Sequence, residues 1–366
     1  MKIIADQDIP FVEQYFKSYG ELILKPGRSI QREDVLDADI LLVRSVTKVD
    51  QALLHDTSVK FVGCSTTGSD HIDLSWLEKN NIRWGSAAGC NAQSVAEYVV
   101  CVIAALQKKE LLKKEKCRAG VVGVGRVGAR VVKMLEILGF EVVQCDPLRA
   151  ETEKDFHSTD LKDFADLDLI SLHTPLTKTG KYPTYHMIEK DFLARQKKDC
   201  VLLSAGRGSV VNFADLKTHG QHLIWCLDVW ENEPLIDRDV MNAALIATPH
   251  IAGHSIQSDY RSIEMLYQVT LDKKIISEKN ISRITYPTKT LSFNDKTVSW
   301  QDVVLKIYDP LVTTQEMKNI LNADVKAFDK LRKDFSGWYE FEFVKVDGVG
   351  LNKRAQELLS VGKEKG

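Results

Sequence analysis

Gly120-Val121-Val122-Gly123-Val124-Gly125-Arg126-Val127-Gly128 is the stretch of sequence that decides the fold of this chain. An apolar run from Cys117 to Val122 leads into it with the character of a buried strand, and apolar residues at helical spacing follow from Val127 to Leu138. Glycines spaced G-x-G-x-x-G are weak evidence alone, because a turn can need glycines for its geometry only. Between a strand and a helix, the same spacing is typical of a dinucleotide-binding turn.

Each glycine of this turn has a physical role in holding a pyrophosphate. Gly123 allows the tight turn, Gly125 lets the phosphates approach the backbone, and Gly128 lets the new helix pack closely on its strand. The N–H groups at the start of that helix, around Arg126 and Val127, then face the phosphates.

A second apolar run, from Glu141 to Asp146, ends on a carboxylate. It comes about twenty residues after the turn, where an acidic side chain takes the ribose hydroxyls of a dinucleotide. The same carboxylate repels a 2′-phosphate. We therefore predict NAD rather than NADP as the cofactor.

Length, charge and hydropathy limit the class of protein. A chain of 366 residues is too long for one ordinary core, so we expect two or three domains. A net charge of −2 provides no field for holding nucleic acid. No segment has the roughly eighteen apolar residues of a membrane span. Met1 to Asp6 opens as a strand without the pattern of a secretion signal, which favours the cytoplasm.

The cysteines predict reduced thiols rather than a disulfide framework. Their number, seven, is odd, and they are scattered through apparent strands and helices. No spacing among them resembles a zinc site, so we expect no metal. Cys64 and Cys90 fall in loops on the expected ligand side and are interpreted as small apolar fillers.

Residues 1–93 alternate between short extended and helical segments, which is typical of a parallel sheet covered by helices. The extended segments are Lys2–Ala5, Glu21–Leu24, Ile40–Val43, Lys60–Gly63 and Ile82–Trp84. A long apolar helix from about Ser94 to Gln107 follows this first unit.

Residues 94–253 predict a second parallel α/β unit, built around the glycine turn. Its further strands are expected near Leu169–His173, Val201–Ser204, Ile224–Asp228 and Leu245–Ala247. Their continuous apolar character is typical of strands buried on both faces. A ligand of such a sheet lies beyond the carboxyl ends of its strands. These ends carry Gly123, Asp146, Thr174, Gly206 and Asp228. Another long helix, roughly Ser255 to Ile275, leads away from the unit.

Residues 285–366 mix helical and extended segments and predict a small α+β domain for oligomerisation. Val303–Leu311 and Thr314–Phe328 stand out in it. In the run Trp338–Phe343, the alternating aromatic side chains would line one face of a strand.

Three signals after the glycine turn predict hydride transfer from a 2-hydroxy acid. Ser204 to Val211 holds an arginine between glycines, Asp228 to Pro234 supplies carboxylates, and Thr248 to Gly253 supplies a histidine. An imidazole can accept the hydroxyl proton as hydride leaves, and a neighbouring carboxylate fixes its tautomer. A guanidinium can hold the substrate carboxylate with two hydrogen bonds. The predicted roles are general base for His250, its partner for Glu233 and substrate clamp for Arg207.

Each of these residues also has a purely structural interpretation. A histidine after a proline can cap a helix, and a glutamate before a proline can serve a turn. The occurrence of all three residue types in chain order favours catalysis.

These motifs resemble the D-isomer-specific 2-hydroxy acid dehydrogenase family. The resemblance extends to Leu42-Val43-Arg44-Ser45-Val46-Thr47-Lys48-Val49, to Phe61-Val62-Gly63 followed by Thr66, Gly68, Asp70 and His71, and to Gly89-Cys90-Asn91-Ala92. It is dense over the first two units and loose over the tail. Within the family, the chain looks most similar to the enzymes of vitamin B6 synthesis that oxidise a phosphorylated four-carbon 2-hydroxy acid.

The resemblance implies two Rossmann-like, doubly wound parallel-sheet domains with a cleft between them. Residues 1–93, completed by about 254–284, would bind the substrate, and residues 94–253 would bind NAD. Residues 285–366 would join two chains into a homodimer in the cytoplasm.

Matched position by position, the resemblance also implies the contacts with cofactor and substrate. The NAD contacts would be Gly123, Gly125, Arg126, Val127, Gly128, Asp146, Thr174, Ala205, Gly206, Asp228 and Gly253. The substrate contacts would include Ser45 and Thr66, and His254 stands where the family commonly has a tyrosine. Arg44, Ser45 and Lys48 follow a strand end and could form a subsite for the substrate phosphate.

Two other functions remain open on the sequence alone. Phosphoglycerate dehydrogenases oxidise another phosphorylated hydroxy acid on the same fold. NAD(H)-sensing corepressors on this scaffold keep the arginine, glutamate and histidine without serving as metabolic enzymes.

Overall fold

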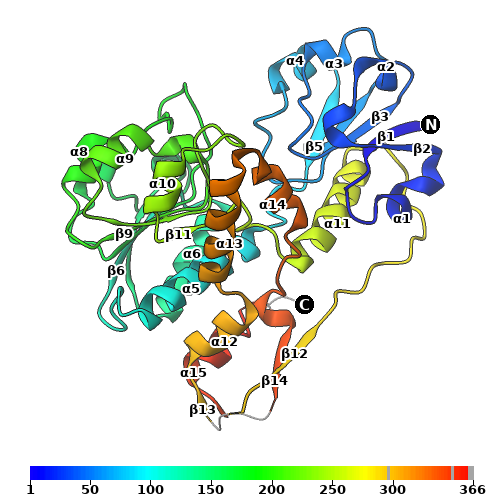
Figure 1. Cartoon of the computed structure of the whole chain (residues 1–366). Coiled ribbons are helices and arrows are strands. Elements are labelled where there is room, and N and C mark those ends of the chain that lie inside the picture. The colour runs from blue at the N-terminus through cyan, green and yellow to red at the C-terminus, as the bar shows by residue number, and fades with distance from the viewer. Residues whose placement is uncertain (295–296, 348–349, 362–366) are drawn as a thin grey trace. The chain divides into compact units, whose positions relative to one another are not determined.

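The computed structural model describes residues 1–294, 297–347 and 350–361 (Figure 1). The chain divides into two compact units, Met1–Asn91 with Gln257–Pro287 and Ala92–Ile256 with Thr288–Gly366. In the described part of the chain, no helix combines the length and hydropathy that a membrane crossing needs.

The first unit is built on a parallel sheet of five strands in the order β2-β1-β3-β4-β5. The strands are β1 (Lys2–Asp6), β2 (Glu21–Lys25), β3 (Ile40–Val43), β4 (Phe61–Cys64) and β5 (Arg83–Ser86). Their register pairs Ile4 with both Ile23 and Leu41. Each strand lies within two residues of the predicted segment, because apolar runs between turn residues mark buried strands clearly.

Helices cover both faces of this sheet (Figure 1). One layer contains α2 (Arg32–Val35), α3 (Gln51–Leu54) and α4 (Leu74–Lys79), and the other contains α1 (Val12–Phe16) and α11 (Ile256–Asp272). Along β3, Leu41 packs toward the first layer and Leu42 toward the second. A Cβ atom on Gly85 would lie 2.1 Å from the side chain of Val269, so the glycine lets α11 pack close to the sheet.

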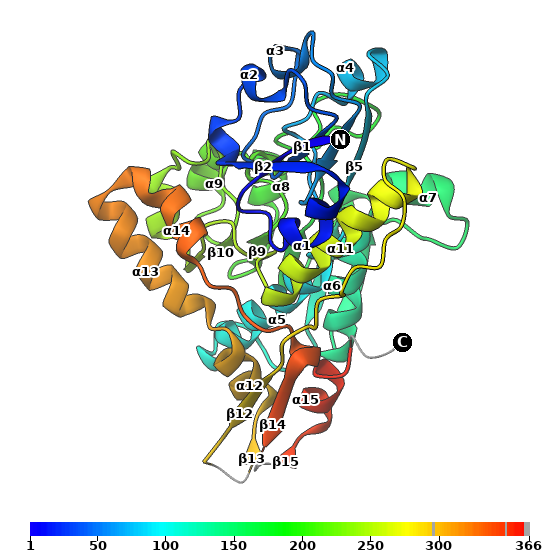
Figure 2. The ribbon, with the colours of Figure 1, turned by 90° about the vertical axis from the view of Figure 1, so that its right-hand side faces the viewer.

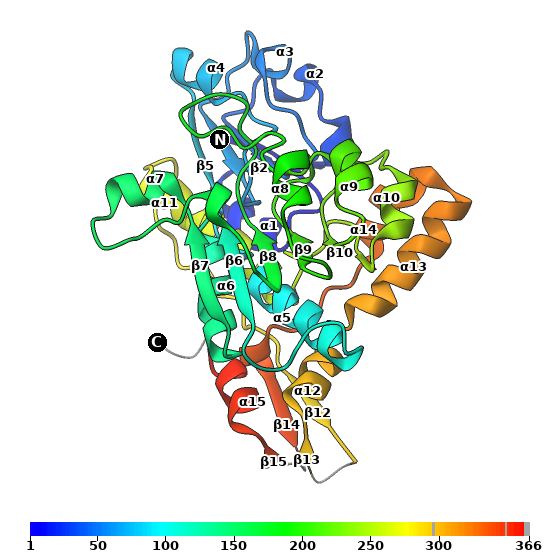
Figure 3. The same cartoon turned by 90° about the vertical axis from the view of Figure 1, so that its left-hand side faces the viewer.

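The second unit contains a parallel sheet of six strands in the order β11-β10-β9-β8-β6-β7 (Figure 3). The strands are β6 (Arg118–Val122), β7 (Glu141–Cys145), β8 (Leu169–Leu172), β9 (Val201–Ser204), β10 (Ile224–Leu227) and β11 (Ile246–Ala247). The chain order reverses beside β6, between β7 on one side and β8 on the other. Ligands of open α/β sheets bind at such a point, and the glycine turn lies at the end of β6.

Helices also flank this second sheet. The cluster on one face includes α5 (Ala92–Lys108) and α6 (Arg126–Ile137), and the cluster on the other includes α8 (Lys190–Ala194), α9 (Phe213–His219) and α10 (Arg238–Ala243). The short helix α7 (Pro147–Thr152) follows β7. The two parallel sheets with their helical layers confirm the predicted α/β fold class.

The C-terminal segment packs on the second unit (Figure 2). Its helices are α12 (Trp300–Ile307), α13 (Pro310–Ala323), α14 (Phe328–Asp334) and α15 (Lys353–Leu358), and its strands are β12 (Lys289–Ser292), β13 (Thr297–Val298), β14 (Val344–Asp347) and β15 (Gly350–Leu351). β12 pairs with β14 and β13 with β15, both in parallel. Helix α12 contacts α5, α13 contacts β11 and α15 contacts α6. Residues 295–296, 348–349 and 362–366 of the predicted tail domain lie outside the described residues.

The prediction of a strand over Trp338–Phe343 is wrong. Trp338 forms an isolated parallel bridge with Ser255, and Phe341–Phe343 form a turn of 3₁₀ helix. The Phe341 N–H donates to the Glu97 carboxyl group on α5 rather than to a neighbouring strand. A hydrogen bond to a helix far away in the sequence therefore decides the backbone conformation of this run, rather than the alternation of its aromatic residues.

Candidate active site

The glycine turn between β6 and α6 has the geometry of a phosphate cradle. Gly123 has φ +83°, which favours glycine, and a Cβ atom on Gly128 would lie 1.9 Å from the Gly123 carbonyl oxygen. A Cβ atom on Gly125 would meet nothing within 4 Å. The backbone therefore borders open space at Gly125, where α6 begins with Arg126 and Val127.

Asp146 stands beside this turn as the N-cap of α7. One carboxylate oxygen accepts from the Val124 N–H at 2.8 Å, and the other accepts from the Arg149 N–H at 3.1 Å. Each oxygen keeps a further lone pair with which to accept from a ribose hydroxyl. A pocket of about 670 Å³ opens here, and its lining includes Gly125, Arg126, Asp146, Arg149 and Glu153. The guanidinium of Arg149 contacts the Val124 carbonyl oxygen and the Glu153 carboxylate.

Three buried polar atoms at the ends of β8 and β9 have no hydrogen-bond partner among the described residues. They are His173 Nδ1, Thr174 Oγ1 and Ser204 Oγ. Buried polar atoms are normally paired, so their grouping beside the switch point fits a polar ligand. These three atoms, the open space at Gly125 and the Asp146 carboxylate together fit the polar groups of NAD.

His173 and Ser204 were missing from the predicted site. Both stand at the carboxyl ends of apolar strands, and that position is the feature of the sequence that could have identified them as site residues. Burial lowers the pKa of His173 to about 3, so its imidazole is neutral at physiological pH. Its Nε2 lies 2.8 Å from Ser171 Oγ.

His250 and Glu233 meet in the loops after β11 and β10. His250 Nδ1 lies 2.8 Å from Glu233 Oε2, and Glu233 Oε1 accepts from the Trp230 N–H at 2.9 Å. Burial acts to raise the pKa of Glu233, but the neighbouring His250 and these hydrogen bonds bring it below its usual value. An ionised Glu233 fixes the proton of His250 on Nδ1, so Nε2 is the ring nitrogen that can exchange a proton with a ligand. His250 has a left-handed backbone, with φ +57°.

Arg207 follows β9, the strand next to β10 in the sheet. A Cβ atom on Gly208 would lie 2.0 Å from the Trp230 carbonyl oxygen, so the Arg207 loop packs directly on the loop that holds Glu233. The Arg207 guanidinium donates to the Gly206 carbonyl oxygen at 2.9 Å. Ala205 and Gly206 lie between β9 and Arg207, and a Cβ atom on Gly206 would lie 3.0 Å from the Thr174 carbonyl oxygen.

Asp228 holds the backbone of the His250 loop. It is fully buried, and its carboxyl oxygens accept from Thr248 Oγ1 at 2.7 Å, the Ile251 N–H at 2.8 Å and the Ala252 N–H at 3.0 Å. Burial raises the pKa of Asp228. Gly253 and His254 continue this loop, in which the His254 N–H donates to the Ile251 carbonyl oxygen.

The second carboxylate of the β10 loop has a different partner. Glu231 Oε1 lies 2.6 Å from His186 Nε2, and Glu231 Oε2 accepts from the Phe213 N–H. Sequence reasoning identified the loop as a source of carboxylates, and the structure pairs Glu233, not Glu231, with His250.

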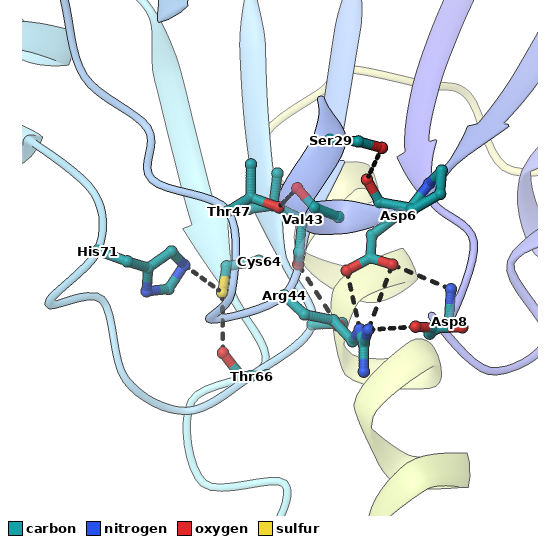
Figure 4. A network of polar contacts seen from close by, with 12 residues as sticks. Asp6, Asp8, Ser29, Val43, Arg44, Thr47, Cys64, Thr66 and His71 are labelled. Carbon is teal, nitrogen blue, oxygen red and sulfur yellow. Dashed lines mark hydrogen bonds and ion pairs between the residues drawn. The ribbon is translucent and has the colours of Figure 1, made fainter. Parts of the chain in front are cut away.

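The predicted substrate residues of the first unit lie at the ends of β3 and β4 (Figure 4). Arg44 makes ion pairs with Asp6 at 2.9 Å and Asp8 at 2.7 Å, and Lys48 pairs with Asp50 at 2.7 Å. Both cations of the predicted phosphate subsite therefore already have carboxylate partners. Ser45, between them, is exposed.

Thr66 contacts a cysteine at the end of β4 (Figure 4). Cys64 Sγ lies 3.1 Å from Thr66 Oγ1 and 3.5 Å from His71 Nε2. Burial raises the pKa of Cys64, which keeps it a thiol. All seven cysteines are buried and unpaired with one another, as the odd count predicted. No group of three or more His, Cys, Asp or Glu residues suited to a metal occurs in the described ranges.

Comparison with known proteins matches this chain to a family of dehydrogenases. Residues 97–252 match the family model "D-isomer specific 2-hydroxyacid dehydrogenase, NAD binding domain". The erythronate-4-phosphate dehydrogenase of Coxiella burnetii is 44% identical over 349 residues, which cover 94% of this chain and 95% of that protein. The enzyme of the same name from Marinobacter nauticus is 37% identical over 377 residues, with 98% and 97% covered.

A solved structure with a similar fold is D-lactate dehydrogenase from Aquifex aeolicus, complexed with NAD and lactic acid. It is 25% identical with a TM-score of 0.63, and the match covers 75% of this chain and 96% of that one.

Proposed function

Because the chain belongs to the D-isomer specific 2-hydroxyacid dehydrogenase family, and within it to the erythronate-4-phosphate dehydrogenases, we propose that it oxidises 4-phospho-D-erythronate. The product would be (R)-3-hydroxy-2-oxo-4-phosphooxybutanoate. The chain is an NAD-dependent oxidoreductase with a small-molecule substrate. The choice of substrate rests on the 44% identity to the Coxiella burnetii enzyme over nearly the whole chain, together with the pairing of Glu233 and His250.

We place the reaction in the synthesis of pyridoxal 5′-phosphate, in the cytoplasm. We also propose a homodimer joined through residues 285–366. The proposed division of labour is that residues 1–93 with about 254–284 bind the substrate and residues 94–253 bind NAD.

His250 is the proposed general base. Its Nε2 accepts the proton of the 2-hydroxyl group while the C2–H bond breaks, and the hydroxyl oxygen becomes the carbonyl oxygen. Glu233, at 2.8 Å from Nδ1, stabilises the imidazolium that forms. NAD, when bound, supplies the acceptor for the hydride from C2. The imidazolium then returns its proton to solvent.

Arg207 is the proposed clamp for the substrate carboxylate. A planar guanidinium can donate two parallel hydrogen bonds to a carboxylate, which fixes the orientation of C2. Ser45, Thr66 and His254 are proposed as further substrate contacts. Thr174, Asp228 and Gly253, together with the glycine turn, Asp146, Ala205 and Gly206, are the proposed NAD contacts.

Removal of the base tests this assignment. In His250→Ala, we expect kcat with 4-phosphoerythronate to fall by roughly 10²- to 10⁴-fold, because only proton transfer is lost. NADH binding, followed by fluorescence titration, should stay near normal. A turnover close to that of the unmodified protein would remove His250 from this role.

A matched pair of glutamates provides the control. Glu233→Gln should lower kcat, whereas Glu231→Gln in the same loop should not, because Glu231 contacts His186 instead. Initial rates with 4-phosphoerythronate and 3-phosphoglycerate decide between the two substrates. A higher kcat/KM with 3-phosphoglycerate would refute the proposed substrate, and no turnover of either would favour an NAD(H)-sensing role.

A further inference from the structure

Helix α5 carries a polar stripe on an otherwise apolar and buried surface. Ser94 Oγ donates to the Ala252 carbonyl oxygen at 2.9 Å, and the Tyr98 hydroxyl lies 2.7 Å from Thr248 Oγ1. Glu97 lies between them in sequence and is fully buried. Residues three and four apart share one face of a helix, so this stripe faces the segment that carries His250.

Glu97 has a second buried carboxyl group as its neighbour, from the C-terminal segment. Its Oε1 accepts from Gln93 Nε2 at 2.8 Å and its Oε2 from the Phe341 N–H at 3.0 Å. Glu340, next to Phe341, is also 0% exposed. Burial and the charge of Glu340 hold the pKa of Glu97 well above its usual range. The Glu97 carboxyl group therefore retains its proton at pH values where an exposed glutamate has lost it.

Glu340 in turn contacts the end of the His250 segment. Its Oε1 accepts from Ser255 Oγ at 2.7 Å, and the Trp338 carbonyl oxygen accepts from the Ile256 N–H at 2.8 Å. Gly337 has φ +74°, and a Cβ atom there would lie 2.8 Å from the His254 carbonyl oxygen. The segment 337–341 therefore lies directly along residues 254–256.

Asp228, Ser94 and Glu340 thus hold successive parts of the chain from His250 to Ser255. Asp228 binds the N–H groups of Ile251 and Ala252, Ser94 binds the Ala252 carbonyl oxygen, and Glu340 binds Ser255. Asp228 and Ser94 belong to the core of the second unit. Glu340 comes from a part of the sequence to which the proposed mechanism assigns no task.

We propose that Glu340 is a positioning residue for catalysis, which through Ser255 holds the His250–Ser255 segment where the imidazole can meet the substrate hydroxyl. This inference rests on the proposed function, because it takes His250 as the base. It gives the C-terminal segment a role in the active site of its own chain, beyond the proposed assembly of the dimer.

The chemistry of the pair explains why an acid occupies this position. A carboxyl group here can accept from Ser255 while it stands beside the buried Glu97 carboxyl group. An apolar side chain would remove the oxygen that accepts from the buried Ser255 hydroxyl, which is costly. A glutamine keeps the shape and a side-chain oxygen that can accept from Ser255.

Kinetics of three variants test the proposal. Glu340→Ala should lower kcat by about 10-fold or more, because small misplacements of a reacting group are expensive, while the KM values and the Kd of NADH stay within about 2-fold. Glu340→Gln should restore most of kcat. Ser255→Ala should reproduce the loss, and the double variant with Glu340→Ala should be no worse than either single one. Lys345→Ala, exposed in the same segment, is the control.

An unchanged kcat in Glu340→Ala, measured well below its Tm, overturns the proposal. So does an equal loss in Glu340→Gln and Glu340→Ala, which would indicate general damage to packing. If Glu340→Ala does not fold, Glu340→Gln and Ser255→Ala still decide, because the proposal requires the first to be active and the second to be slow.

Amide hydrogen exchange provides a readout that needs no substrate. The amides of His254 and Ile256 should exchange at least about 10-fold faster in Ser255→Ala, with those of β6 and β10 unchanged. Equal exchange would overturn the anchoring role. Absence of wild-type turnover with 4-phosphoerythronate refutes the proposed function instead, and the exchange experiment then still decides whether Glu340 anchors the segment.

Discussion

Arg44 holds its positive charge between two carboxylates. Asp6 is fully buried and Asp8 is one-third exposed, and both lie within 3 Å of the guanidinium. A substrate phosphate that approaches Arg44 must therefore compete with them, so the affinity that Arg44 can supply is reduced. If Arg44 contacts the phosphate, Asp8 is the partner whose removal costs least, because its carboxylate is already partly hydrated.

Asp8→Asn tests this competition. We expect KM for 4-phosphoerythronate to fall by about 1.4- to 5-fold, which corresponds to the ~0.2–1 kcal/mol of a partly exposed ion pair, with kcat unchanged. Steady-state kinetics at low and high salt provide the measurement, since the gain should shrink as salt screens it. Asp50→Asn is the variant matched to Asp8→Asn, because it removes the ion-pair partner of the exposed Lys48. An unchanged or higher KM in Asp8→Asn would place the phosphate elsewhere.

Individual residues were predictable where a motif carries the chemistry. Glu233 and His250 are only 17 positions apart and stand in recognisable loops, and they meet as paired side chains. The partners of Arg44 lie 38 and 36 positions away, in a segment without any motif. Opposite charges are common on any surface, so no sequence pattern indicates which carboxylate approaches which cation.

At the scale of elements, the turn between β6 and α6 contains glycines with two different roles, one in packing and one in leaving space for the cofactor. Gly128 is needed for packing, because a Cβ atom there would lie 1.9 Å from a backbone oxygen. Gly125 borders open space and is dispensable for packing. A substitution at each position therefore distinguishes support of the fold from room for the cofactor.

We predict opposite outcomes for Gly128→Ala and Gly125→Ala. The first should lower the free energy of unfolding by about 1–3 kcal/mol, through overpacking. The second should leave the Tm unchanged and weaken NADH binding about 10-fold, because its methyl group occupies the space for the pyrophosphate. Thermal unfolding and fluorescence titration measure the two effects. Normal NADH affinity in Gly125→Ala would move the pyrophosphate away from this turn.

The strands and long helices were predictable because each is a continuous local pattern. The helix expected from Val127 to Leu138 spans Arg126–Ile137, and β3 and β9 have the predicted bounds. The error at Trp338–Phe343 has a non-local cause. Its backbone is held by Ser255 and Glu97, which a window of neighbouring residues does not contain.

At the scale of the whole molecule, α5 joins the nucleotide-binding sheet to the C-terminal segment. Ser94 and Tyr98 contact the His250 segment, and the intervening Glu97 contacts Phe341, 244 positions along the chain. In the sequence, Glu97 is one acidic residue within an apolar helix. Nothing local distinguishes a buried, protonated carboxyl group from a solvated one, so this connection required the three-dimensional structure.

The raised pKa of Glu97 predicts the direction in which stability depends on pH. Above the usual glutamate value of about 4.5, the unfolded chain releases a proton that the folded chain retains. The free energy of unfolding therefore falls as pH rises from there toward the pKa in the folded state. The acidic neighbours Glu340 and Glu342 act in the same direction, since both raise the pKa of Glu97.

Glu97→Gln removes this titration but keeps the shape of the side chain. As pH rises above about 5, its free energy of unfolding should fall less steeply than that of the unmodified chain, by up to ~1.4 kcal/mol per pH unit for one proton. Urea unfolding at several pH values measures both slopes, and the exposed Glu115→Gln should retain the original slope. Identical slopes in Glu97→Gln and the unmodified chain would mean that Glu97 is ionised in the folded protein. The packing of α5 against the C-terminal segment would then have to overcome the cost of burying the Glu97 charge.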